Sequence, residues 1–235
     1  MPGCSTREAI QANHRFMVQD DASTGHMDPN PVRDDLEEGI SRFCPIDAII
    51  NVVLDEKKQV IHAVYGHFIK AHRLGCKFLD QVYLKPIEQQ ADIVIVSQGG
   101  APKDLNLYQT QKALDNSQYA VKDGGIIILV GSCQEGLGEE VFERWLSEAE
   151  NSKELITRIS KNFELGGHKA AAIALVLERA RIFLVSDMDD EKVKSIFMEP
   201  YHTVQEALDA ATDELGTDTS VIVMPYGGST LPRTI

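Results

Sequence analysis

The stretch that decides the fold is IVIVSQGGAPKD, residues 93–104. Its four uninterrupted apolar residues are typical of a strand covered on both faces, and a glycine-rich loop follows them. Three more short apolar runs lie at residues 126–130, 182–185 and 221–224, and they alternate with predicted helices, of which the first is residues 105–121 and the last is residues 204–215. This alternation predicts an α/β fold, with a Rossmann-like parallel sheet and helices on both of its faces. Ligands of such sheets bind beyond the carboxyl ends of the strands, so we expect a site in the loops that follow the strands.

The residues before this sheet follow a different pattern. Helices are predicted at residues 5–17, 32–43 and 69–84, and a β-hairpin at residues 48–54 and 59–65. Residues 85–90 are polar and contain Pro86, which predicts a linker. We therefore expect a smaller α/β segment with a hairpin, residues 1–86, followed by the sheet domain, residues 87–235.

Composition and charge exclude several classes of function. The chain has 235 residues and a formal net charge of −13, which disfavours binding to a nucleic-acid backbone. No apolar run reaches the roughly 18 residues that span a bilayer, and the first residues lack the pattern of a signal peptide. The four cysteines form no C-x-x-C pair, so they are interpreted as reduced thiols rather than a metal site or disulfides. We expect a cytoplasmic protein with neither a membrane nor a nucleic acid as partner.

Three loops that follow predicted strands are rich in glycine, at residues 97–104, 131–138 and 225–230. Glycine lets the backbone approach a ligand closely, although it also serves simply to turn the chain. Three such loops at one edge of a sheet favour a pocket. None of them matches the G-x-G-x-x-G or G-x-x-x-x-G-K-[ST] fingerprint, so nucleotide binding of those two kinds is not predicted.

A few polar side chains near these loops are candidates for a site. Asn106, Gln109 and Lys112 are spaced three residues apart, so they share one helix face. An amide and an ammonium group suit a carboxylate ligand, but the spacing alone favours a solvated helix face. His168 follows two glycines at the start of a predicted helix, and His14 lies on the first helix. A lone histidine is more often a packed or surface residue than a metal ligand.

Short motifs occur in one order along nearly the whole chain. They are PGCST (2–6), ANH (12–14), NPVRDD (30–35), NVVLD (51–55), GGAPKDLNLYQ (99–109), KALDN (112–116), KDGG (122–125), EGLG (135–138) and LGGHK (165–169). This ordered series resembles the nickel-pincer lactate racemase family, and it is far more specific than any single glycine motif.

The resemblance implies a site and a cofactor. It implies a 2-hydroxyacid racemase or epimerase that uses a nickel pincer nucleotide (nickel pyridinium-3-thioamide-5-thiocarboxylic acid mononucleotide) for hydride transfer. His14 falls on the position that ligates nickel, and Gln109 and Lys112 fall on positions that contact the substrate carboxylate. Lactate racemases carry a tryptophan near the position of His168, so a histidine in this substrate pocket suggests a different or larger 2-hydroxyacid.

The resemblance also implies that part of the enzyme lies outside this sequence. In the family, the lysine that tethers the cofactor and the two acid–base histidines precede the stretch that begins here at Pro2. We therefore expect residues 1–86 to be the end of a cofactor-binding N-terminal domain, with the rest of that domain as a partner, and residues 87–235 to be the substrate domain. The chain alone is expected to be inactive.

The sequence also allows two alternative functions from other classes of protein. One is a non-enzymatic α/β module that binds a small anion or a metal. The other is a nicotinamide-dependent oxidoreductase, which the absence of a dinucleotide fingerprint disfavours.

Overall fold

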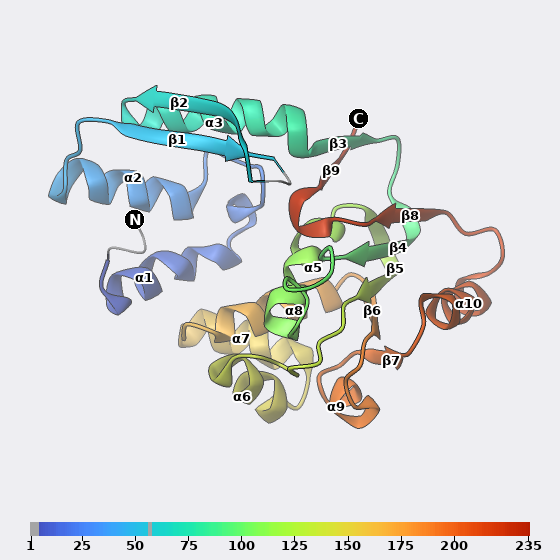
Figure 1. Cartoon of the computed structure of the whole chain (residues 1–235). Helices are drawn as coiled ribbons and strands as arrows, with labels where there is room; N and C mark the ends of the chain where they lie inside the picture. Colours follow the sequence, from blue (N-terminus) through green and yellow to red (C-terminus); the bar gives the residue numbers. More distant parts are fainter. Residues whose placement is uncertain (1–4, 56–57) are drawn as a thin grey trace. The chain divides into compact units, whose positions relative to one another are not determined.

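The computed structural model describes residues 5–55 and 58–235, and the chain forms two compact units, Met1–Leu84 and Lys85–Ile235. Figure 1 shows the elements of both units. The first residues of the PGCST motif (2–4) and two residues of the hairpin turn (56–57) lie outside the described residues. The two units are described separately below.

The first unit has the predicted order of elements. It contains α1 (Arg7–His14), α2 (Pro31–Phe43), β1 (Ile49–Leu54), β2 (Val60–Gly66) and α3 (Phe68–Tyr83), with two short 3-10 helices at Arg15–Val18 and Asp20–Ala22. Local chemistry fixes the helix starts. The Thr6 hydroxyl accepts from the backbone N–H of Ala9, and the Asn30 side chain accepts from that of Arg33. Each oxygen satisfies a backbone donor that has no partner within its helix.

The hairpin packs one of its faces on α3. β1 and β2 are antiparallel, with Val53 opposite His62 and Asn51 opposite Val64. The His62 ring stacks on Phe78 of α3 at a centroid distance of 3.9 Å. The hairpin is thus anchored to a helix, as a two-stranded sheet must be to persist in water.

The second unit is built on a five-stranded parallel sheet in the order β7-β6-β5-β4-β8. The strands are β4 (Ala91–Ser97), β5 (Val121–Val130), β6 (Arg181–Val185), β7 (Glu199–Tyr201) and β8 (Val221–Met224). The four strands predicted from apolar runs are all present, and the predicted α/β fold class is confirmed. β7 is an addition that apolar patterning did not predict, because this edge strand is only three residues long.

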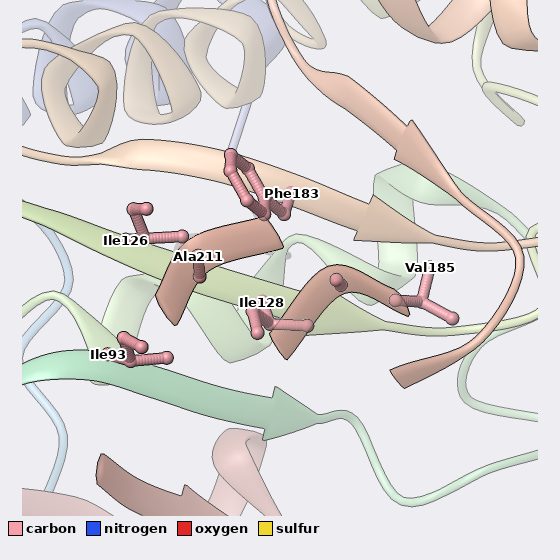
Figure 2. Packing of buried hydrophobic residues seen from close by; sticks show 7 residues of the cluster. Ile93, Ile126, Ile128, Phe183, Val185 and Ala211 are labelled. Atoms are coloured by element: carbon pink, nitrogen blue, oxygen red, sulfur yellow. The ribbon is translucent and has the colours of Figure 1, made fainter. Parts of the chain in front are cut away.

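Helices cover both faces of this sheet, because its strands alternate apolar side chains between two layers. On one face Ile93, Ile126, Ile128 and Phe183 pack against Ala207 and Ala211 of α10, as Figure 2 shows. On the other face, Val96 meets the loop that follows β8 close to Ala113 of α5. The apolar residues of the central strands β4, β5 and β6 are mostly buried, which explains why these runs are apolar without interruption.

The remaining helices of the second unit are α4 (Leu107–Thr110), α5 (Lys112–Ser117), α6 (Glu140–Glu148), α7 (Ser152–Lys161), α8 (Gly167–Leu177), α9 (Asp190–Ser195) and α10 (Val204–Leu215). The single helix expected at residues 105–121 is shorter and divided at Gln111. The expected linker contains a short strand instead, β3 (Leu84–Ile87), which pairs with β9 (Leu231–Thr234) near the end of the chain.

Candidate functional site

Gln109 and Lys112 lie together beside the carboxyl end of the sheet. Asn106 caps α4 by accepting from the backbone N–H of Gln109 at 3.1 Å. Lys112 Nζ donates to Gln109 Oε1 at 2.5 Å, and the Lys112 side chain is exposed. The lysine uses one lone pair of the amide oxygen, and the Gln109 N–H₂ group can donate to a ligand. The pair therefore offers two kinds of donor, one of them charged, which suit a carboxylate.

An ion pair between Asp115 of α5 and Lys169 of α8 joins these two helices. Lys169 Nζ lies 3.4 Å from Asp115 Oδ2, and the lysine side chain is only 17% exposed. Burial raises the pKa of the Asp115 carboxyl, although the charge of Lys169 acts in the opposite direction. The first turn of α8 is thereby tied to the helix that carries Lys112. Sequence reasoning missed this pair, because its members are 54 residues apart.

His168 lies in that first turn of α8 and is buried, with 9% of its surface exposed. Its Nδ1 accepts from the backbone N–H of Gly166 at 3.1 Å, and its ring stacks on Phe163. A Cβ on Gly167 would lie 2.4 Å from the Trp145 ring, so only glycine permits this approach. His168 is therefore a packed side chain whose Nδ1 acts as an acceptor, which leaves Nε2 to carry the proton in the neutral ring.

Three glycines of the predicted loops are needed for close packing within the protein. A Cβ at Gly227 would lie 2.3 Å from Val96, and one at Gly138 would lie 2.3 Å from Asn106. Gly131 is similarly close to Thr110. These contacts hold the loops against the strand ends and against α4 and α5, so the glycines support the site by allowing close packing.

Cys133 and Tyr108 also belong to this region. The Cys133 thiol is buried and contacts the hydroxyl of Thr110. Burial raises its pKa to about 11, so it stays protonated and unreactive at neutral pH. Tyr108 packs edge-on against Phe142, and burial followed by the charge of Glu139 raises the pKa of its phenol. The Tyr108 phenol is thus uncharged at neutral pH.

His14 is the last residue of α1, in the first unit. Burial lowers the pKa of its imidazole, which favours the neutral form that binds metal ions. Its neighbour Asn13 is 2% exposed and donates from Nδ2 to Val32 O and to Asp35 Oδ2, both at 2.8 Å. These two hydrogen bonds fix the end of α1, and with it His14, against α2.

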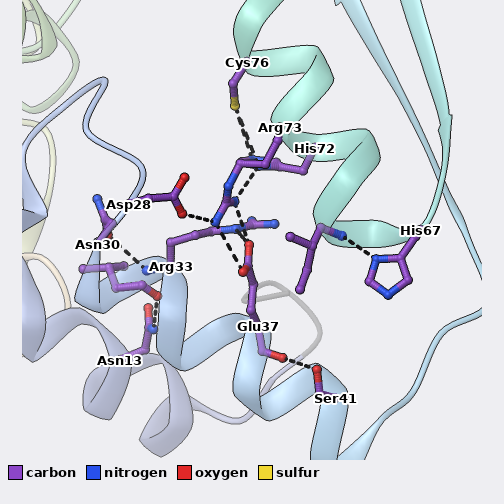
Figure 3. Close-up of polar contacts among 12 residues, drawn as sticks. Asn13, Asp28, Asn30, Arg33, Glu37, Ser41, His67, His72, Arg73 and Cys76 are labelled. Atoms are coloured by element: carbon purple, nitrogen blue, oxygen red, sulfur yellow. Dashed lines mark hydrogen bonds and ion pairs between the residues drawn. The ribbon is translucent and has the colours of Figure 1, made fainter.

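A charged network holds α2 to α3 nearby, as Figure 3 shows. Glu37 accepts from Arg33 Nε at 2.7 Å and from Arg73 Nη1 at 2.8 Å, and Arg73 also reaches Asp28. The Glu37 side chain is only 12% exposed. The two carboxylates and the two guanidinium groups of this network neutralise each other's charge. We therefore interpret the network as holding α2 in place rather than as a binding site for a charged ligand.

The part of the chain that the structure describes contains no cluster of three or more His, Cys, Asp and Glu side chains able to hold a metal ion. No described helix combines the length and the apolar character needed to cross a bilayer. A single imidazole at position 14 fits a metal only if the other ligands come from elsewhere.

Comparison with known proteins decides the family. The family described as the lactate racemase C-terminal domain matches residues 87–231. The chain belongs to this family. The resemblance seen in the ordered motifs is therefore confirmed as membership of the lactate racemase family.

Individual relatives extend the match into the first unit. The chain is 34% identical to a lactate racemase of Thermoanaerobacterium thermosaccharolyticum, over 99% of this chain and 56% of the relative. It is 31% identical to a lactate racemase of Lactiplantibacillus plantarum, over 97% and 55%. The solved structure of the Thermoanaerobacterium apoprotein matches with a TM-score of 0.89 at 33% identity, over 95% of this chain and 55% of that one.

A second solved structure, of a Thermotoga maritima protein, shares the fold with a TM-score of 0.62 at 15% identity. The chain spans about half the length of the curated relatives it matches.

Proposed function

We propose that this chain forms part of a nickel-dependent 2-hydroxyacid racemase or epimerase, and that it binds the substrate through Gln109 and Lys112. The observation that carries the proposal is the contact between these two side chains, which brings an ammonium group and an amide N–H₂ group together. Membership of the lactate racemase family supports a 2-hydroxyacid as that ligand.

The two side chains have a positioning role in this reaction. A 2-hydroxyacid inverts only if its C–H bond is broken, and a carboxylate held at two points keeps that carbon in one orientation. Lys112 supplies a positive charge that attracts the carboxylate, and the Gln109 amide supplies a hydrogen bond that orients it. The buried imidazole of His168 lies in the turn next to Lys169, and we propose that it lines the substrate pocket and selects a 2-hydroxyacid other than lactate.

His14 is proposed as the nickel ligand from this chain. Its lowered pKa keeps the ring neutral, and Asn13 anchors the end of its helix. When bound, the nickel pincer nucleotide supplies the hydride acceptor that protein side chains lack. Residues 1–86 then complete a cofactor-binding domain, residues 87–235 form the substrate domain, and the enzyme is cytoplasmic. The lysine tether and the acid–base histidines are expected in the partner region, so the chain alone should not racemise a 2-hydroxyacid.

Replacing Lys112 tests the substrate site. Lys112→Met should weaken binding of lactate and larger 2-hydroxyacids to the chain by about tenfold or more, because a hydrogen bond from a charged donor is lost. The measurement is a titration followed by two-dimensional amide NMR. Lys161→Met is the matched control, since Lys161 is an exposed lysine at the end of α7. Equal affinities in the two variants would remove Lys112 from the site.

Replacing His14 tests the metal site. In protein loaded with the cofactor together with the partner region, His14→Ala should lower the nickel content several-fold, as measured by inductively coupled plasma mass spectrometry. His202→Ala is the control, because that imidazole is exposed. Retention of stoichiometric nickel in the His14 variant would show that the metal is held without it.

A further inference from the structure

The outer face of the hairpin consists of apolar side chains that face solvent. We define this outer face by its cross-strand partners, Ile50 with Tyr65, Val52 with Ala63, and Leu54 with Val60. Ile50 and Tyr65 are 73% and 75% exposed, and Val52 is 50% exposed. The opposite face packs on α3 through His62 and Val64.

Strands that are apolar on both faces belong inside a layered structure. A sheet with one solvated face normally alternates apolar and polar residues, whereas IINVVL in β1 is almost continuously apolar. An exposed patch of this kind marks an interaction surface or an aggregation hazard. The described residues of β1 pair only with β2, so the other edge of β1 also offers backbone groups to a partner.

The edge of β1 also borders a cavity. A space of about 290 Å³ lies between β1 and α3, lined by Val53 and Leu54 on one side and by His72, Cys76 and Leu79 on the other. Val52 and Leu54 belong both to the outer face and to the lining of this cavity, so the two adjoin.

The lengths of the relatives indicate which partner would cover the outer face of the hairpin. The family-wide match covers residues 87–231, which lie in the second unit. The first unit matches the relatives upstream of that domain, and nearly half of each relative has no counterpart in this chain. We propose that the outer face of the hairpin is the docking surface for the N-terminal part of a lactate racemase polypeptide. The inference rests on the proposed function, because it names the partner that completes the enzyme.

Co-expression tests this surface. The 235-residue chain, carrying an affinity tag, is produced together with the segment of the Thermoanaerobacterium lactate racemase that precedes its match to this chain. The wild-type chain should retain that segment at one-to-one stoichiometry. Val52→Glu should lower the recovered segment at least about tenfold, because a charge would be buried without a partner. Val52→Thr, which keeps the shape, should retain most of it.

Controls separate docking from folding and from substrate binding. Val223→Glu, on the exposed strand β8 of the second unit, should retain the segment fully. In the chain alone, Val52→Glu should leave the thermal unfolding temperature unchanged, since the side chain is half exposed there. Lys112→Met should also retain the segment. If the complex forms but Lys112→Met binds 2-hydroxyacids as tightly as the wild-type chain does, the proposed function fails while the docking inference stands.

Three results would overturn the inference: no capture by the wild-type chain, equal capture by Val52→Glu, or a dimer of the chain alone that Val52→Glu converts to a monomer. The last would assign the outer face to a second copy.

Discussion

In Lys85–Ile235 the apolar side chains of the central strands β4, β5 and β6 are mostly buried between helices, whereas the hairpin of Met1–Leu84 has large apolar side chains that face solvent. The apolar side chains buried in the first unit are Ile40, Phe68 and Ala71, among the residues described. Figures 2 and 3 show the contrast: an apolar layer in one unit, and a network of charged groups in the other. The sheet domain is therefore stabilised by its own apolar core. The smaller unit has few buried apolar side chains, so polar contacts contribute a larger share of its stability, and its exposed apolar surface is available to a partner.

The largest expected effect lies in the core of the second unit. Ile128→Ala should lower the free energy of unfolding by about 2–5 kcal/mol, because Ile128 is fully buried and its loss leaves a cavity. The chain has one tryptophan, Trp145, in the second unit, so its fluorescence during urea unfolding follows that unit.

Ile50→Ala on the hairpin is the matched replacement. It should change the stability of the first unit by less than about 0.5 kcal/mol, because Ile50 is 73% exposed. Hydrogen exchange of the hairpin measures this, since Trp145 lies in the second unit. An equal loss of unfolding free energy in Ile128→Ala and Ile50→Ala would contradict the proposed difference between the two units.

A smaller effect is expected where the first unit relies on charge. Arg73→Met should destabilise that unit by about 1–3 kcal/mol, because Glu37 then loses a partner while it is largely shielded from water. Hydrogen exchange of α2 and α3 peptides measures this locally. Arg42→Met removes an ion pair with Glu38 in which both side chains are more than half exposed, and it should change exchange little. If both arginine variants exchange alike, the network is not what holds α2 to α3.

Sequence patterns predicted the second unit well, because its strands are buried and carry a strong apolar signal. α10 has the predicted bounds of residues 204–215, where Thr203 and Glu206 form a reciprocal cap. β7 was missed because Glu199–Tyr201 contains a proline and lies at an edge. β3 was missed because it pairs with β9, which is far away in the sequence.

The candidate site was predictable only in part. The contact between Gln109 and Lys112 follows from helical spacing, and the structure shows it. The ion pair between Lys169 and Asp115 could not be predicted from a local pattern, because the two residues are far apart in the sequence. The burial of His168 depends on Gly167 meeting Trp145, which is a tertiary contact. The roles of His14, Gln109, Lys112 and His168 in catalysis stay predictions.

The smallest expected effect is a difference in how the units respond to acid. Burial, followed by the charges of Arg33 and Arg73, lowers the pKa of His72 below its ordinary value of 6.5, although Glu37 acts in the opposite direction. The folded first unit therefore binds fewer protons than its unfolded chain, and it loses stability as the pH falls through 6.5 and below. In the second unit the raised pKa of Asp115 has the opposite sign, so acid favours its folded form.

Hydrogen exchange at about pH 7.5 and about pH 5.5, corrected for the intrinsic rates, should show weaker protection of α3 at the lower pH. His72→Gln should reduce this loss, because the replacement cannot be protonated, while Cys76 and Glu37 stay in place beside it. An equal loss of α3 protection in wild type and in His72→Gln would mean that another group, such as His14, controls the acid response of the first unit.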